Sequence, residues 1–465
     1  MTSRNTPTRQ QITTSVPQTD RHPHGIAGPR APHDGAVATG TTIGRRDFLR
    51  TSTAALGTTA WAFAAGASAA DTAERPVRVG VMGLSRGRQL AYVFAQQPHV
   101  TVKYVCDVDE NRANAAAQFL KSRGFETTPI RDFRRILDDP QIDALVCAAP
   151  NHWHGPATIL ACKAGKHVYV EKPCSHNPQE GEWMVQAARK YKRCVQMGTQ
   201  RRSGPGTRLA IQKLREGIIG RVYLSRSWYN NVRGPIGHGK PAPVPPNLDY
   251  DLWQGPAPRV PYYDNRIHYN WHWFWHWGNG ELGNNGVHSI DLSRWGLGVD
   301  YPVRVTSSGG RYRYDDDQQT PDTHTVCFEF PGECQIVWEG LSCNRHRIGW
   351  VAFYGENGAL ELDSNGTHRV YDARDKLVDE YKTNRLGEPE HVQNFLQAVR
   401  ADDPSLLNQE IEEGHKSTLL CHLGNIAHRT GHTLECDPAN GHIRNDDQAM
   451  ALWRREYEPG WEPQV

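Results

Sequence analysis

The stretch Val77-Arg78-Val79-Gly80-Val81-Met82-Gly83-Leu84-Ser85-Arg86-Gly87 decides the fold of this chain. Its apolar residues predict a buried strand, and the glycines predict a tight turn into a helical pattern over residues 89–97. A second strand, residues 100–106, ends at Asp107. In a dinucleotide-binding fold the glycines let the backbone approach a pyrophosphate, and an acid about 20 residues later receives the ribose hydroxyls. The spacing predicts such a fold.

The glycine motif departs from the usual one, because Ser85 stands where the middle glycine is expected. We interpret Ser85 as a phosphate hydrogen-bond donor. The same letters match the Gly-x-Ser-x-Gly elbow of hydrolases, but that elbow follows a late strand, whereas this strand is the first of its domain. Asp107 has no basic residue directly after it, which favours NAD over NADP. The predicted cofactor contacts here are Gly83, Leu84, Ser85, Arg86, Gly87 and Asp107.

Strands and helices go on alternating as far as residue 198. Helical patterns over residues 111–123, 156–164 and 179–191 alternate with strands over 144–149, 167–170 and 194–197. This alternation predicts a doubly wound parallel sheet, a Rossmann domain covering residues 71–198.

One of these strands ends in Glu171-Lys172-Pro173. A strand that ends there places a lysine at the carboxyl edge of the sheet, where open α/β sheets bind ligands. Glu171 is expected to hold the Lys172 ammonium, and Pro173 to fix the turn.

The glycine turn, Asp107, Pro150-Asn151-His152 and Glu171-Lys172-Pro173 together resemble the Gfo/Idh/MocA family of oxidoreductases, over residues 76–435. The resemblance implies NAD contacts from Pro150, Asn151, His152, Glu171 and Lys172. It also implies that His288 is the catalytic histidine, acting with Lys172. Asn284 stands where the family usually has an aspartate, and it cannot exchange a proton.

The second half predicts an α+β domain over residues 199–465. Alternating patterns such as 324–330, 335–340, 350–354 and 359–362 indicate an open, largely antiparallel sheet, followed by helices over 389–401 and 411–429. In the family resembled, one face of this sheet commonly forms a subunit interface, so a homo-oligomer is expected.

Residues 234–261 are rich in proline and glycine and predict a surface or lid loop. In residues 266–277 Trp recurs at every second position, so an extended segment would present indoles on one face as a sugar platform; an aromatic core strand is the equal alternative. His268, His272 and His276 also have helical metal-ligand spacing, although we predict no metal. The candidate substrate contacts are His154, Gln200, Arg201, Arg202, Trp271, His272, Trp273 and His276.

The first seventy residues differ from the rest. Residues 1–40 predict disorder, and Arg45-Arg46, an apolar stretch over 51–65 and Ala67-Ser68-Ala69 follow in the order of a twin-arginine signal peptide. We expect export by the twin-arginine machinery to the periplasm or beyond. The ten cysteines form no CxxC pair and predict buried thiols in a protein that folds before export.

Charge and hydropathy narrow the function further. Residues 1–70 contain seven Arg and three Asp, so 46 of the 53 basic and 48 of the 51 acidic residues lie in the rest, which gives no reason to expect nucleic acid. A mean hydropathy of −0.67 and the lack of a long apolar run predict no membrane span in the mature part.

Together these features predict an exported NAD-dependent oxidoreductase that acts on a sugar or glycoside hydroxyl with tightly held cofactor. Two alternatives stay open: a glycoside-cleaving or glycoside-modifying enzyme that oxidises, eliminates and reduces without net redox change, and a sugar-binding relative without activity.

Overall fold

The computed structural model describes residues 75–346 and 349–465. The predicted leader and signal peptide lie outside the described residues.

The first part of the described chain is a six-stranded parallel sheet in the order β3-β2-β1-β4-β5-β6. Its strands are β1 (Val77–Met82), β2 (Val100–Cys106), β3 (Thr128–Ile130), β4 (Ala144–Cys147), β5 (His167–Val170) and β6 (Val195–Met197). The order reverses between β1 and β4, so a crevice opens at their carboxyl ends. The glycine turn after β1 and Pro150 after β4 both lie at this crevice, as the doubly wound prediction requires.

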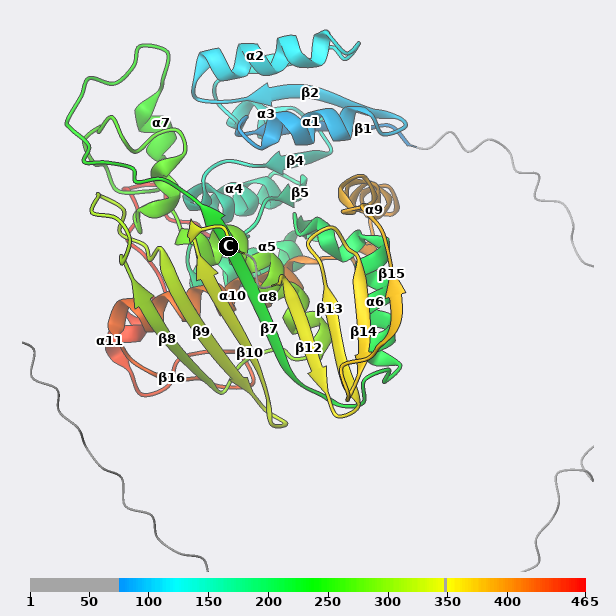
Figure 1. The fold of residues 1–465 in the computed structure, drawn as a ribbon. Coiled ribbons are helices and arrows are strands. Elements are labelled where there is room, and N and C mark those ends of the chain that lie inside the picture. The colour runs from blue at the N-terminus through cyan, green and yellow to red at the C-terminus, as the bar shows by residue number, and fades with distance from the viewer. Residues whose placement is uncertain (1–74, 347–348) are drawn as a thin grey trace, which may run out of the picture. The chain divides into compact units, whose positions relative to one another are not determined.

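Helices cover both faces of this sheet (Figure 1). They are α1 (Gly87–Ala95), α2 (Glu110–Lys121), α3 (Arg134–Asp138), α4 (Asn151–Lys163) and α5 (Pro178–Tyr191). One apolar core joins α1 and α2 to the sheet, and a second joins α3, α4 and α5 to the opposite face. A late helix, α9 (Glu388–Ala401), adds Phe395 and its neighbours to the first core, so the chain returns to the Rossmann domain after the second sheet.

The second sheet has ten strands in the order β15-β14-β13-β12-β7-β10-β9-β8-β16, with β11 paired to β7. All its pairs are antiparallel except the β7–β10 pair. Its strands are β7 (Val222–Val232), β8 (Arg304–Gly310), β9 (Thr323–Phe330), β10 (Cys334–Leu341), β11 (Cys343–Asn344), β12 (Val351–Gly355), β13 (Gly358–Leu362), β14 (His368–Asp372), β15 (Leu377–Tyr381) and β16 (Leu434–Glu435).

Three helices pack on one face of this sheet: α6 (Pro205–Arg215), α8 (Val287–Leu297) and α10 (Ile411–Thr430). In Figure 1 the opposite face, turned toward the viewer, carries no helix among the described residues. The α+β prediction with one covered face is confirmed. The remaining short elements are η1 (Gln200–Ser203), α7 (Tyr250–Gln254), η2 (Asn270–Trp273), η3 (Leu282–Gly286), η4 (Pro404–Leu406) and α11 (Asp447–Met450).

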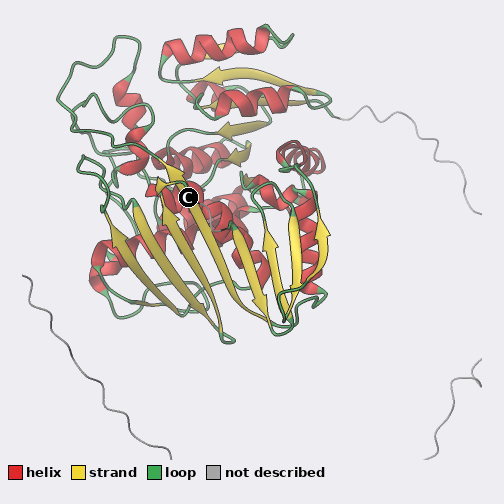
Figure 2. Ribbon diagram, viewed as in Figure 1, coloured by secondary structure: helices red, strands yellow, loops and turns green. Residues whose placement is uncertain are grey.

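A long excursion between β7 and α8 consists mostly of loops around α7 (Figure 2). It has a small core of its own, which includes Trp253, Trp271, Phe274 and Trp277. The extended segment predicted for residues 266–277 is therefore wrong. Residues 271, 274 and 277 recur every third position, which is the period of 3₁₀ turns, and this spacing buries the aromatic rings better than alternation does.

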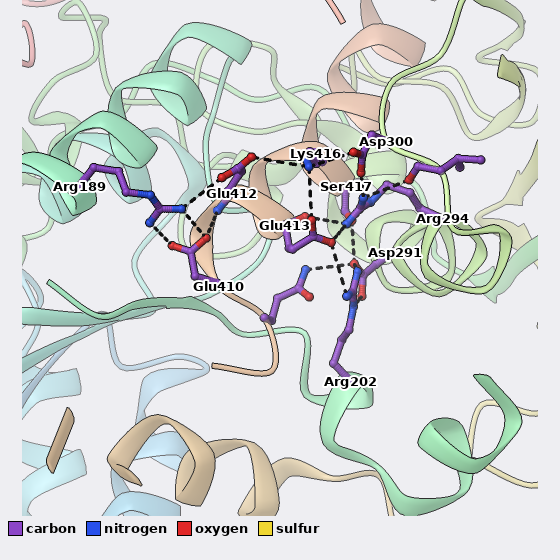
Figure 3. Close-up of polar contacts among 12 residues, drawn as sticks. Arg189, Arg202, Asp291, Arg294, Asp300, Glu410, Glu412, Glu413, Lys416 and Ser417 are labelled. Carbon is purple, nitrogen blue, oxygen red and sulfur yellow. Dashed lines mark hydrogen bonds and ion pairs between the residues drawn. The ribbon is translucent and has the colours of Figure 1, made fainter. Parts of the chain in front are cut away.

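A buried charge network ties α8 to α10 (Figure 3). Arg202 donates to both carboxylate oxygens of Asp291 at 3.0 and 2.8 Å, and Asp291 also accepts a hydrogen bond from Ser417 Oγ. Arg202 is 4% exposed. The prediction that it contacts substrate is wrong, because its guanidinium is committed to an internal ion pair.

All ten cysteines are free, and seven of them are buried, as predicted. Within residues 75–346 and 349–465, every helix is too short or too polar to cross a membrane.

Candidate functional site

The crevice between β1 and β4 contains a cavity of about 70 Å³, called the nucleotide cavity below because it lies where a doubly wound sheet binds nucleotides. It is lined by the turn residues Gly83, Leu84 and Ser85 and by Asp107 and Pro150. Gly83 has a φ of +86°, and a Cβ at this position would lie 2.5 Å from Ala149 N. A side chain here would therefore displace the turn from the end of β4.

Asp107 anchors the same turn. Its carboxylate accepts hydrogen bonds from Leu84 N at 2.8 Å and from Asp109 N at 3.0 Å. Burial raises the pKa of Asp107, whereas these two hydrogen bonds lower it. The carboxylate is thus held at the edge of the cavity, where a Rossmann fold binds the ribose of a dinucleotide.

A second cavity of about 320 Å³ continues from the first, and the two share Ser85, Ala148, Ala149, His268 and Trp271 as lining residues. This second cavity is called the lysine cavity below, because Lys172 lines it together with other polar and ionisable side chains that the sequence predicted. Arg86, Asn151, Glu171, Lys172, Asn284 and His288 all line it.

Lys172 donates from Nζ to the backbone oxygen of Asn284 at 2.7 Å and to its side-chain Oδ1 at 3.4 Å. Burial lowers the pKa of Lys172, although the carboxylates of Glu171 and Glu281 act in the opposite direction. Glu171 does not bind the ammonium, contrary to expectation. It pairs with Arg86 at 3.1 Å and accepts the backbone N–H of Lys172, so its role is to hold the glycine turn and the lysine strand together.

His288 stands beside this lysine on the first turn of α8. Its pKa is held well below the usual value by burial and by the positive charges of Lys172, Arg201 and Arg86. A pKa lowered in this way favours the neutral imidazole. Its Nδ1 atom is buried and has no hydrogen-bond partner among the described residues.

A carboxylate does lie close to Asn284, one turn earlier in the chain. Glu281 is 5% exposed, and its Oε1 accepts a hydrogen bond from Asn284 Nδ2 at 3.3 Å. It also forms an ion pair with Arg233 and accepts a hydrogen bond from Asn285. The amide of Asn284 thus connects a buried carboxylate to the Lys172 ammonium.

Two predicted cofactor contacts do not face either cavity. Gly87 lies under the turn, where a Cβ would be 3.0 Å from Val81 Cγ1. His152 is fully buried, and its Nε2 bonds the Trp253 carbonyl at 2.9 Å. Its neighbours in the motif face the cavities instead, because α4 starts at Asn151, earlier than predicted, and the helical turn directs His152 toward the excursion.

The predicted substrate residues divide into two groups. His154, Gln200, Trp271 and His272 line the lysine cavity. The two ring nitrogens of His154 lie 2.6 and 2.7 Å from the carbonyl oxygens of Pro173 and Ala149, so this side chain shapes the cavity floor. His272 stacks on Trp271 with ring centroids 3.6 Å apart, and burial lowers its pKa to about 3.

The second group, which includes Trp273 and His276, does not line the lysine cavity. Trp273 is 3% exposed and packs under the Arg233 guanidinium. His276 bonds the Pro258 carbonyl, and His268 pairs with Asp109, so the three histidines with metal-ligand spacing do not converge. The spacing of these histidines would bring them together only in an α-helix, and residues 268–276 do not form one.

Arg201 lines a third cavity of about 230 Å³, together with Trp228, Tyr229 and Trp350. His288 lines both this cavity and the lysine cavity, so the two adjoin at this residue. The Arg201 guanidinium lies 5.1 Å from the Trp350 ring centroid and donates to the Ser364 carbonyl. Burial lowers the pKa of Arg201 to about 10, and no carboxylate among the described residues pairs with it.

Sequence reasoning missed several residues of the site. Arg131 directly follows β3, so its place at the carboxyl edge could have been predicted. Glu281 lies three residues before Asn284, a spacing that brings two side chains together on a helix. Leu252, Trp253 and Tyr269 reach the cavities from the excursion, and no local pattern indicates that.

Comparison with known proteins agrees with this geometry. The family description "Oxidoreductase family, NAD-binding Rossmann fold" matches residues 77–199, and "Oxidoreductase family, C-terminal alpha/beta domain" matches residues 227–462. Levoglucosan dehydrogenase of Pseudarthrobacter phenanthrenivorans is 32% identical over 33% of this chain and 40% of that protein. Inositol 2-dehydrogenase/D-chiro-inositol 3-dehydrogenase of Lactiplantibacillus plantarum is 26% identical over 62% of this chain and 70% of that protein.

Among solved structures, levoglucosan dehydrogenase in complex with NADH and levoglucosan shares the fold, with a TM-score of 0.62 at 19% identity over 78% of this chain and 99% of that chain. The chain spans less than half the length of the levoglucosan dehydrogenase that it matches in sequence. The open glycine turn and the anchored Asp107 fit a dinucleotide, and the family's first domain binds NAD. The chain belongs to the Gfo/Idh/MocA oxidoreductase family, with an NAD-binding Rossmann domain followed by the family's C-terminal α/β domain.

Proposed function

We propose that this protein is an NAD-dependent dehydrogenase that acts on a hydroxyl group of a sugar or glycoside. One observation carries the proposal: the Lys172 ammonium and the neutral His288 ring line the same cavity, and that cavity is continuous with the nucleotide side of the crevice. Bound NAD⁺ supplies a hydride acceptor, so the chain itself has to orient the hydroxyl and take its proton.

The two side chains divide these tasks. Lys172 has three N–H donors, and two of them have partners in Asn284. The third is available to hold the substrate oxygen. His288 is uncharged at neutral pH and can accept the hydroxyl proton, and the positive neighbours that lower its pKa favour passing that proton on.

The third cavity supports a substrate larger than one sugar ring. Trp228, Tyr229 and Trp350 offer aromatic surface beyond His288, and aromatic rings are common supports for sugar faces. A glycoside with its reacting ring beside Lys172 and its second group beside Trp350 would occupy both cavities.

We also propose that the cofactor stays bound between turnovers. The excursion covers the nucleotide cavity, because Asp109 pairs with Leu248 in a β-bridge and with the His268 ring at 2.9 Å. Asp249 N bonds the Val108 carbonyl at 3.0 Å beside them. We expect NAD(H) to co-purify through gel filtration, as detected by mass spectrometry; protein free of nicotinamide would contradict tight retention.

Export by the twin-arginine pathway remains our proposal for residues 1–70. Because that pathway carries folded proteins, a retained cofactor would suit it. Fractionation should find the protein outside the cytoplasm, and Arg45→Lys together with Arg46→Lys should retain it inside. Equal export of both forms would contradict this route.

The helix-free face of the second sheet supports a homo-oligomer. Three large apolar residues of this sheet are partly exposed: Tyr223 in β7 is 41% exposed, and Leu377 and Val378 in β15 are 47% and 55% exposed. Light scattering after gel filtration should give a mass that is a multiple of the monomer, and a monomeric mass at micromolar concentration would contradict the expectation.

The main experiment is a steady-state assay with a panel of sugars and glycosides, in which both NADH and released aglycone are followed. Lys172→Ala and His288→Ala should each lower turnover by on the order of 10²-fold, the usual effect of a positioned acid or base. Lys376→Ala, a lysine in an exposed turn, serves as the matched control and should keep full activity. Aglycone release without net NADH would favour the cleaving alternative, and no turnover with any glycoside would favour the binding protein.

A further inference from the structure

A large cavity of about 570 Å³ lies outside the catalytic site and shares no lining residue with it. It is formed by the start of α5, the Trp275–Asn279 turn, the end of α10 and the C-terminal segment around residues 452–456. His276, whose place near the substrate was predicted from sequence, lines this cavity instead. The cavity therefore needs an explanation of its own.

The charge of this cavity is positive. Arg429, Arg454 and Arg455 line it, and Glu456 is the one acidic residue among its lining residues. Arg455 pairs with the buried carboxylate of Glu180, but the structure shows no carboxylate partner for Arg429 or Arg454 among the described residues. Arg429 instead lies over the Trp275 ring, 5.2 Å from its centroid. Two guanidinium groups thus remain available to an anion.

Four lining residues also have a buried polar atom without a partner among the described residues: His176 Nδ1, Asn177 Nδ2, Asn279 Oδ1 and Arg455 NH1. His176 bonds the Trp275 carbonyl through Nε2 at 3.1 Å, so this nitrogen carries the proton and Nδ1 is an acceptor. Asn279 Oδ1 is a second acceptor, while Asn177 Nδ2 and Arg455 NH1 are donors. Buried polar atoms usually have partners, so this cluster is unusual.

These requirements define the chemistry of a ligand. Two free acceptors call for a molecule with O–H groups, and the arginines call for a negative charge. The Trp275 ring adds a flat apolar surface. We propose that this cavity is a binding site for a hydroxylated carboxylate of the sugar-acid class, separate from the catalytic site and independent of the function proposed above.

Titration calorimetry of the purified protein tests this, with sodium D-gluconate and sodium D-glucuronate as probes. At least one of them should bind with one site per chain. D-glucose lacks the negative charge and sodium acetate lacks the hydroxyl groups, so each should bind at least about tenfold more weakly. Arg429→Gln and Arg454→Gln should each weaken binding by about tenfold or more, the scale of a charged hydrogen bond. Both arginines are exposed, so these substitutions should not affect folding.

Two controls locate the binding site. Arg374→Gln removes an exposed positive charge from the β14–β15 turn and should leave the affinity unchanged. Lys172→Ala should also leave it unchanged, which separates this site from catalysis. The proposal is overturned if neither sugar acid binds, if acetate or inorganic phosphate binds as tightly, if the Arg429 and Arg454 variants bind like Arg374→Gln, or if Lys172→Ala abolishes binding.

Discussion

Asn284→Asp is the substitution that tests the arrangement around Lys172 most directly. The asparagine is 8% exposed and lies between two charges: its Nδ2 is 3.3 Å from Glu281 Oε1, and its Oδ1 is 3.4 Å from Lys172 Nζ. A carboxylate in its place would face Glu281 with one oxygen and the lysine with the other. The first contact is repulsive and the second attractive.

The two effects are of similar size. With an effective dielectric constant of about 20, unit charges at these separations interact by about 5 kcal/mol, so repulsion by Glu281 and attraction by Lys172 nearly cancel. We therefore expect Asn284→Asp to change the free energy of unfolding by less than about 2 kcal/mol in the wild-type background. In a Lys172→Met background the attraction is lost, and the same substitution should cost about 3 kcal/mol or more.

Urea unfolding at pH 8 is measured for the wild-type protein, Asn284→Asp, Lys172→Met and the double variant. These four free energies give the coupling energy between positions 172 and 284, which should exceed about 2 kcal/mol. Asn285→Asp is the matched control: Asn285 also donates to Glu281, but no hydrogen bond or ion pair joins it to Lys172 in the structure. Asn285→Asp should lower the free energy of unfolding by the same amount in the wild-type and Lys172→Met backgrounds. If positions 172 and 284 are additive within about 0.5 kcal/mol, the reasoning is refuted.

Three further predictions concern other parts of the structure. Gly83→Ala should weaken NAD binding at least about tenfold in calorimetry, whereas Gly124→Ala, which has a similar positive φ but no atom within 4 Å of its Cβ, should cost only stability, about 1 kcal/mol. His391 is fully buried and burial lowers its pKa to about 4, so folding should lose about 3 kcal/mol as the pH falls from 6.5 to 4, and unfolding of His391→Gln should depend less steeply on pH over that range. Asp109→Ala removes the pairing with His268 and the N-cap of α2, and should release cofactor faster in a dilution assay; an unchanged release rate would contradict the covering role of the excursion.

The parts of the fold that follow from local pattern could be predicted from sequence. Five of the six strands of the first sheet lie within a few residues of their predicted bounds, because buried parallel strands and amphipathic helices have different periods; the three-residue β3 was not predicted. Lys172 and Asp107 could be placed at the carboxyl edge for the same reason. The return of α9 to the first domain could not, since Phe395 meets the α1 core across some 300 residues of chain.

The prediction of an extended segment over residues 266–277 was wrong for a related reason. Spacing by two suited a strand, yet the rings of Trp271 and Trp277 found their partners in Trp253 and its neighbours, far back in the excursion. Which indole is buried depends on that small core. The alternation of residues along the chain does not indicate which indoles meet that core. The sequence therefore favoured a sugar platform and an aromatic core strand equally.

Asn284 shows how a departure from a family pattern can be explained only by its surroundings. An aspartate here would lie 3.3 Å from Glu281 in a site where both side chains are almost fully buried, and the repulsion between the two carboxylates would be offset only by the attraction of Lys172. An amide avoids this repulsion: its N–H group faces the glutamate and its oxygen faces the lysine. The negative charge near Lys172 is therefore kept: Glu171 and Glu281 both act to raise the lysine pKa against the effect of burial. On this reasoning Glu281 and Asn284 act together, and replacing Glu281 by Gln should make Asn284→Asp better tolerated than it is in the wild-type chain, as urea unfolding of the double variant would show.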